Sequence, residues 1–100
     1  MKVQTVSKTG TGSSDALVMN TNVSPFNVGF GAVVDGSATY TVQHTFDDPA
    51  VGFTDWFSHP TVAAQTANAD GNYAFPVTGI KVVISSGAGS VTLNVVQAGI

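Results

Sequence analysis

Cysteine is absent from the 100 residues of this chain, so neither a disulfide framework nor a thiolate metal site can form. Packing alone must therefore stabilise the fold. Long apolar runs are also missing: no segment approaches the about 20 residues of a membrane span, and residues 1–10 alternate in polarity where a signal peptide would be apolar. We expect a chain with no membrane partner that is made and used without Sec export.

Charge is scarce as well. Arginine and glutamate do not occur, and charged residues make up 9% of the chain, against roughly 25% in an ordinary soluble domain. Three lysines cannot form a basic face, and the net charge of -3 repels phosphate, so we expect no nucleic acid partner. The hydrophobic fraction of 43% leaves apolar and neutral surface that a free monomer would bury by association. These proportions predict a protein that packs against other proteins.

Alternating polarity predicts two strands in the middle of the chain. From Ala38 to Phe46 one face is largely apolar and the other is polar, which is the period of a half-buried strand. Val28–Val34 alternates in a similar way, and Asp35-Gly36 separates the two segments. Because Asp-Gly favours the positive φ angles of a tight turn, we expect these strands to pair directly as a hairpin.

The same pattern predicts a second hairpin, Ile80–Ser85 and Ser90–Gln97, joined by Gly87-Ala88-Gly89. Helical character is confined to Ala50–Phe57. About seven or eight short strands in a single domain of residues 1–100 predict an all-β fold, an antiparallel β-sandwich or jelly roll. The shorter strands are expected at Val3–Ser7, Ala16–Asn20, Thr61–Ala67 and Tyr73–Val77, with Pro76 placing the last of them at an edge or bulge.

Titratable residues near the end of the first predicted hairpin raise the possibility of a metal site or of acid-base chemistry. They are His44, Asp47, Asp48 and His59. We favour a structural role, because Asp47 and Asp48 precede Pro49, where aspartates bond the backbone N–H groups of a turn. The chain also has no His-x-His pair and no glutamate to complete the usual ligand sets.

Three further motifs match a functional site by residue type alone. Asn68–Asn72 has oxygen-bearing residues at alternate positions, but its glycine is misplaced for a calcium loop and no bidentate acidic residue follows, so we expect an Asx turn. Lys8–Ser14 has the residues of a phosphate loop in the reverse order. Ser58 and His59 are neighbours whose side chains point apart in an extended chain. We expect no enzyme activity and no catalytic residue, cofactor or metal.

Phe53, Trp56 and Phe57 lie close together after the aspartates, and two interpretations of them stay open. The three rings form either a core plug that closes one end of the sandwich or an interface or ligand patch, for which they are the candidate residues. Gly29 and Gly31 share one face of their strand and leave a groove that Trp56 would fill.

Two long segments carry a family resemblance. They are Asn27–Pro49, which reads NVGFGAVVDGSATYTVQHTFDDP, and Thr66–Gln97, which reads TANADGNYAFPVTGIKVVISSGAGSVTLNVVQ. Both resemble small structural proteins of tailed bacteriophage virions, including the capsid decoration (cement) proteins. The resemblance implies a β-sandwich or jelly-roll subunit, often a homotrimer, that lies on the capsid surface and links neighbouring major capsid proteins. It implies no catalytic or cofactor-binding residue.

Composition and resemblance together predict a capsid decoration protein, made in the host cytoplasm and located on the virion surface, that stabilises the head by bridging major capsid proteins. An alternative from another class is a glycan-binding module, in which the rings of Phe53, Trp56 and Phe57 stack on sugars beside Asp47 and Asp48. A structural module of a head fibre, neck or tail is a further alternative, since phages place similar small β domains there.

Overall fold

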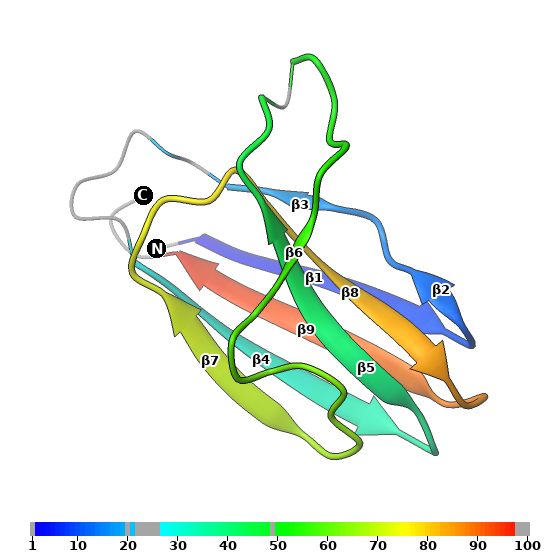
Figure 1. Ribbon diagram of the computed structural model, residues 1–100. Helices are drawn as coiled ribbons and strands as arrows, with labels where there is room; N and C mark the ends of the chain where they lie inside the picture. Colours follow the sequence, from blue (N-terminus) through cyan, green and yellow to red (C-terminus); the bar gives the residue numbers. More distant parts are fainter. Residues whose placement is uncertain (1, 20, 22–26, 49, 98–100) are drawn as a thin grey trace.

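The computed structural model describes residues 2–19, 21, 27–48 and 50–97, and these residues form an antiparallel β-sandwich (Figure 1). One sheet has the strand order β1-β9-β4-β7, and the other has the order β2-β8-β5-β6, with β3 also paired to β8. The predicted all-β fold is therefore confirmed. The described residues contain no helix that could span a membrane. The strands are β1 (Lys2–Thr9), β2 (Gly12–Ser13), β3 (Leu17–Val18), β4 (Val28–Asp35), β5 (Thr39–Thr45), β6 (Phe57–Ser58), β7 (Ala69–Tyr73), β8 (Gly79–Ser86) and β9 (Ser90–Gln97).

Both predicted hairpins are wrong, because the two strands of each one lie in different sheets. β4 pairs with β9 and β7, whereas β5 pairs with β8 and β6. A two-residue turn of the Asp-Gly type needs positive φ at both residues. Gly36 has a φ of 87°, but Asp35 is not among the described residues with positive φ. The connections β4–β5 and β8–β9 are therefore arches that cross from one sheet to the other.

The two arches, residues 36–38 and 87–89, pack directly against each other. The Gly89 N–H donates a hydrogen bond of 2.8 Å to the Ser37 carbonyl. A Cβ atom at Gly89 would lie 2.6 Å from the carbonyl oxygen of Asp35 and 2.6 Å from the nitrogen of Ser37. Real Cβ atoms do not approach backbone so closely, so a glycine is required at this position. The contact holds β4 beside β9 and β5 beside β8.

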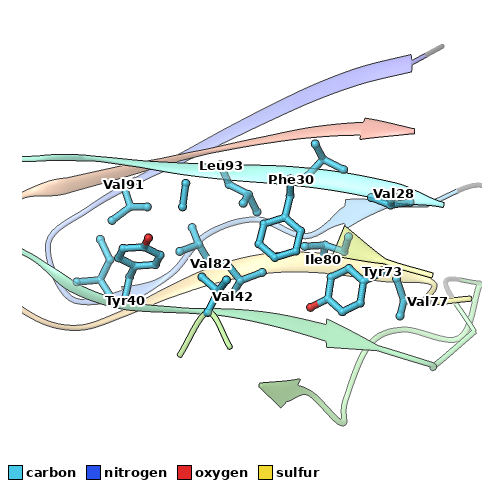
Figure 2. Packing of buried hydrophobic residues seen from close by; sticks show 14 of the residues in the cluster. Val28, Phe30, Tyr40, Val42, Tyr73, Val77, Ile80, Val82, Val91 and Leu93 are labelled. Atoms are coloured by element: carbon cyan, nitrogen blue, oxygen red, sulfur yellow. The ribbon is translucent and has the colours of Figure 1, made fainter. Parts of the chain in front are cut away.

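Apolar side chains from both sheets fill the space between them (Figure 2). On β5 the inward apolar residues are Tyr40 and Val42, as the alternation in the sequence predicts. Full burial of such a side chain contributes about 1.5–3 kcal/mol to folding. On β8 and β9 the inward residues, each at most 1% exposed, are Ile80, Val82, Ile84, Val91, Leu93 and Val95.

The short elements near the N-terminus and after β5 differ from expectation in their extent. β1 contains the predicted Val3–Ser7 and is longer. β3 covers only Leu17–Val18 of the Ala16–Asn20 segment, whose last residue lies outside the described residues. Ala50–Phe57 forms no helix; it is a loop that ends in β6. Gly52, at a φ of 116°, is incompatible with a helix there.

The segments before and after β7 also differ. Thr61–Ala67 forms no strand and contributes one bridge, between Gln65 and Tyr40. A strand is expected at Tyr73–Val77, but β7 ends at Tyr73, so Pro76 lies beyond the ladder. Because Pro76 is not part of a ladder, its missing N–H group costs no ladder hydrogen bond.

The arch contact predicts a large cost for one added methyl group. We expect Gly89→Ala to lower the free energy of unfolding by about 2 kcal/mol or more, because overpacking against fixed backbone costs about 1–3 kcal/mol. Gly29→Ala is the matched control, since a Cβ atom there meets nothing within 4 Å. Urea denaturation of both variants measures the difference, and equal stabilities would contradict the arch contact.

Candidate functional site

The three predicted site residues do not form one cluster, because adjacent residues of an extended segment point to opposite faces. The rings of Phe53 and Trp56 contact each other with centroids 5.5 Å apart, and the Lys81 ammonium lies 4.2 Å from the Trp56 ring centroid. Phe57 instead contacts Phe46, at a centroid distance of 5.7 Å. The predicted site is thus divided between two places.

Phe53 and Trp56 lie on the outer face of the sheet that contains β5 and β8. A Cβ atom at Gly79 would be 3.1 Å from the Phe53 ring, so this ring covers the start of β8. Lys81 is two residues further along β8 and lies over Trp56. Burial lowers the pKa of Lys81. Because neither ring is part of the core between the sheets, the core-plug interpretation does not hold for this pair.

Phe57 belongs to a surface group that we call the phenylalanine patch, which consists of Phe46, Phe57 and Phe75. These residues are 53%, 51% and 44% exposed, respectively. The Phe46 ring centroid is 5.7 Å from that of Phe57 and 6.1 Å from that of Phe75. Phe46 follows β5 and Phe75 follows β7, so the patch joins the two sheets at the flank between edge strands β6 and β7.

His44 lies beneath the phenylalanine patch and is only 6% exposed. Its ring centroid is 5.4 Å from that of Phe46, 6.0 Å from that of Phe57 and 5.6 Å from that of Phe75. In register, His44 is directly opposite Phe57, so both side chains lie on the inner face of the sheet. The patch is therefore the outer end of the core rather than a group of unsupported rings.

Tyr73 continues these ring contacts into the core. Its ring centroid is 4.8 Å from that of His44 and 5.5 Å from that of Phe30, and Figure 2 shows Tyr73 and Phe30 side by side. The Tyr73 hydroxyl lies 2.9 Å from His44 Nδ1. Burial raises the pKa of Tyr73; burial, followed by the charge of His59, lowers the pKa of His44. Both groups are thus neutral at pH 7, and the patch rests on a packed, uncharged column of rings.

His59 closes the same flank with hydrogen bonds and is 7% exposed. Its Nδ1 accepts bonds from the backbone N–H groups of Thr61 at 3.2 Å and Val62 at 3.1 Å. An accepting Nδ1 leaves the proton on Nε2, which donates to the Asn72 carbonyl at 3.3 Å. His59 thereby links the segment after β6 to β7. The residues that the structure describes include no group of three metal-ligating side chains.

Asp47 and Asp48 bond the backbone of the loop after β5, which confirms the predicted turn capping. Asp47 Oδ2 accepts bonds from the N–H groups of Asp55 at 2.8 Å and Thr54 at 2.7 Å, and these bonds lower the pKa of Asp47. Asp48 Oδ1 accepts a bond from the Ala50 N–H at 2.9 Å. One oxygen of each carboxylate that the glycan interpretation needs as a sugar acceptor is therefore engaged by the loop.

Two further expectations are corrected by the structure. Asn68–Asn72 lies mostly in β7 and is not an Asx turn; the Asn68 side-chain oxygen instead accepts a bond of 2.8 Å from the Val34 N–H of β4. Gly29 and Gly31 lie on β4, but a Cβ atom at either residue would meet nothing within 4 Å. Trp56 therefore does not fill a groove above them.

The burial of His44 predicts a loss of stability in mild acid. The pKa of folded His44 lies below its ordinary value of 6.5, so the stability contributed by the neutral ring is complete above that pH and is lost as the pH falls toward the folded pKa. We expect the urea midpoint to fall from pH 6.5 downward. His44→Asn retains an acceptor near the Nδ1 position and does not titrate, so its profile should be flatter.

The acid-induced loss assigned to His44 is separable from that of Asp47. The pKa of Asp47 is below its ordinary value of 3.8, so the stability from its bonds is present above that pH and is lost only at lower pH. Urea titrations of the wild type and of His44→Asn at several pH values above 4 therefore exclude the loss assigned to Asp47. An equally steep profile in His44→Asn would assign the effect to another group.

Comparisons of the chain with known protein families, with curated proteins and with solved structures found no match in any of the three. The functional conclusion therefore depends on the geometry of the chain itself and on the sequence resemblance given above. Within that geometry, the phenylalanine patch is an exposed apolar surface that continues into the core through His44 and Tyr73.

Proposed function

We propose that this chain is a capsid decoration protein of a tailed bacteriophage, which binds assembled major capsid protein on the virion surface and catalyses no reaction. The observation that carries the proposal is the phenylalanine patch, whose three rings are each about half exposed. Aromatic side chains are enriched in the centres of protein interfaces and supply a large share of the binding free energy there.

Preorganisation of the patch supports a binding role. Phe46, Phe57 and Phe75 all contact His44, so their rings are already packed before a partner arrives. Ordering a mobile side chain at an interface costs about 0.5–1.5 kcal/mol, and a packed ring avoids most of that cost. A rigid apolar surface of this kind favours attachment to a fixed partner such as an assembled shell.

Composition and sequence resemblance favour the capsid among possible partners. Phe46 lies in Asn27–Pro49 and Phe75 lies in Thr66–Gln97, the two segments that resemble phage virion proteins. A charged fraction of 9% suits a subunit whose surface is covered by neighbours. Bound across the joints between capsid proteins, such a subunit stabilises the assembled shell by mass action.

The two alternatives use different surfaces or positions. A module of a head fibre, neck or tail would use the same patch at another place on the particle. The glycan-binding alternative needs rings and free carboxylates that converge. Trp56 is instead covered by the Lys81 ammonium, and Phe57 points away from it.

Truncation of one patch ring tests the proposal. We expect Phe57→Ala to weaken binding of the purified chain to capsids that lack it by about 30-fold, because loss of a central aromatic anchor costs about 2 kcal/mol or more. Val33→Ala is the control, since Val33 is 47% exposed on β4 outside the patch. Cosedimentation with capsids measures both affinities, and a Phe57→Ala chain that binds like wild type would contradict the role of the patch.

Cryo-electron microscopy of the virion tests the position. We expect density for this chain on the head, above joints between major capsid proteins. Density only on the tail or a fibre would support the structural alternative instead. If the particle showed no density for this chain, both the capsid role and the structural alternative would be wrong. Glycan binding by the wild-type chain that is abolished in the Trp56→Ala variant would favour the glycan-binding role.

The proposal includes self-association into a homotrimer. Outside the patch, Val3, Val18 and Val96 are 56%, 46% and 37% exposed, which leaves apolar surface for contacts between copies. Light scattering of the purified chain should give three times the chain mass of 10.2 kDa. A stable monomer at high concentration would contradict this part of the proposal.

A further inference from the structure

The loop between β5 and β6 projects beyond the rest of the sandwich, as Figure 1 shows. We call residues 46–48 and 50–56 the β5–β6 loop. Its base is tied down by Thr45, whose hydroxyl donates a bond of 2.8 Å to the Asp55 carbonyl. Near its tip, two backbone N–H groups donate bonds of 3.0 Å to the Asp48 carbonyl. With the bonds to Asp47 described above, the loop is a preformed projection.

The β5–β6 loop carries charge of one sign. Asp47, Asp48 and Asp55 are three of the six side-chain carboxylates in the chain, and no lysine lies between them. Asp48 and Asp55 belong to exposed positions of the loop. Lys81, on β8 of the same sheet as β5 and β6, lies over the Trp56 ring. The exposed carboxylates of the loop thus create a local negative potential that attracts cationic groups.

Apolar side chains are exposed near these carboxylates, both at the tip and at the base of the loop. Val51, near the tip, is 85% exposed. At the base, Phe46 is the first residue of the loop and Phe57 directly follows it, and these two residues form two thirds of the phenylalanine patch. The β5–β6 loop thus combines exposed carboxylates with an exposed valine, and the phenylalanine patch lies at its base.

We infer that the β5–β6 loop and the phenylalanine patch form one docking surface for a protein segment in which an apolar side chain is flanked by lysine or arginine. The rings accept the apolar side chain, and Asp48 and Asp55 face the cationic groups. This inference rests on the proposed function in taking the patch as the contact surface, and it adds the chemistry of the partner. Complementary charge at the rim of an apolar contact mainly accelerates association and selects the partner.

Neutralising the loop tests the charge requirement. Asp48→Asn with Asp55→Asn removes two charges and keeps an amide oxygen for the Ala50 N–H bond. At low salt we expect its association rate with capsids that lack the chain to fall about fivefold, and its salt dependence to flatten. Asp15→Asn with Asp70→Asn is the matched control, because both carboxylates are exposed and lie outside the loop. Equal rates in the two double variants would overturn the inference and leave capsid binding intact.

A capsid-free experiment separates this inference from the proposed function. The probes are two capped tetrapeptides, Arg-Leu-Phe-Arg and Glu-Leu-Phe-Glu, titrated into the isotopically labelled chain. We expect the Phe46 and Phe57 ring resonances to shift with the arginine peptide only, and less so in the Asp48→Asn, Asp55→Asn variant. Shifts with the arginine peptide in a chain that binds no capsid would retain the docking surface and reject the capsid role. Equal shifts with both peptides, or none with either, would overturn the inference.

Discussion

The contact between the two arches determines which strands become neighbours in this fold. Because Gly89 approaches the backbone of Asp35 and Ser37 too closely for a Cβ atom, the arch of residues 36–38 and the arch of residues 87–89 stack one on the other. β4 then runs beside β9 and β5 runs beside β8, each over almost its whole length. The inward faces of these four strands supply most of the core, so the packing of the interior follows from the arch contact.

The column of rings extends that packing to the surface. Phe30 lies in the core, Tyr73 and His44 follow, and the phenylalanine patch is the exposed end. The hydrogen bond from His59, which follows β6, to the Asn72 carbonyl of β7 joins the two sheets beside this column. The exposed rings therefore share the rigidity of the interior, which distinguishes them from apolar residues that stand alone on the surface.

The sequence predicts the strands of this fold much better than their pairing. Alternation within Ala38–Phe46 and Ser90–Gln97 depends on local burial, and both segments are strands with the expected inward faces. Pairing depends on the partner arch. A hairpin and an arch contain the same turn residues, and one positive φ at Gly36 in place of two makes the difference. That difference cannot be obtained from Asp35-Gly36 alone.

The candidate site was predictable in part by the same reasoning. Trp56 and Phe57 are adjacent, so alternation alone separates them, and Phe46 already belongs to the inward face of a predicted strand. Phe75 follows the end of β7, and no periodic pattern marks it. Its place beside Phe46 requires the two sheets to be assembled, which is long-range information.

The register of the outermost ladder has a consequence for biosynthesis. Lys2 is paired with Gln97, and among the described strands β1 is paired with β9 alone, so β1 has no ladder partner until β9 has been synthesised. Because every long ladder joins segments far apart in the chain, loop-closure entropy must be overcome before any sheet is stable, and folding is slow for a chain of this size. β1 of a nascent chain is therefore unpaired until β9 has been made, and Lys8 in β1 is the kind of residue that keeps such a strand from pairing with other chains.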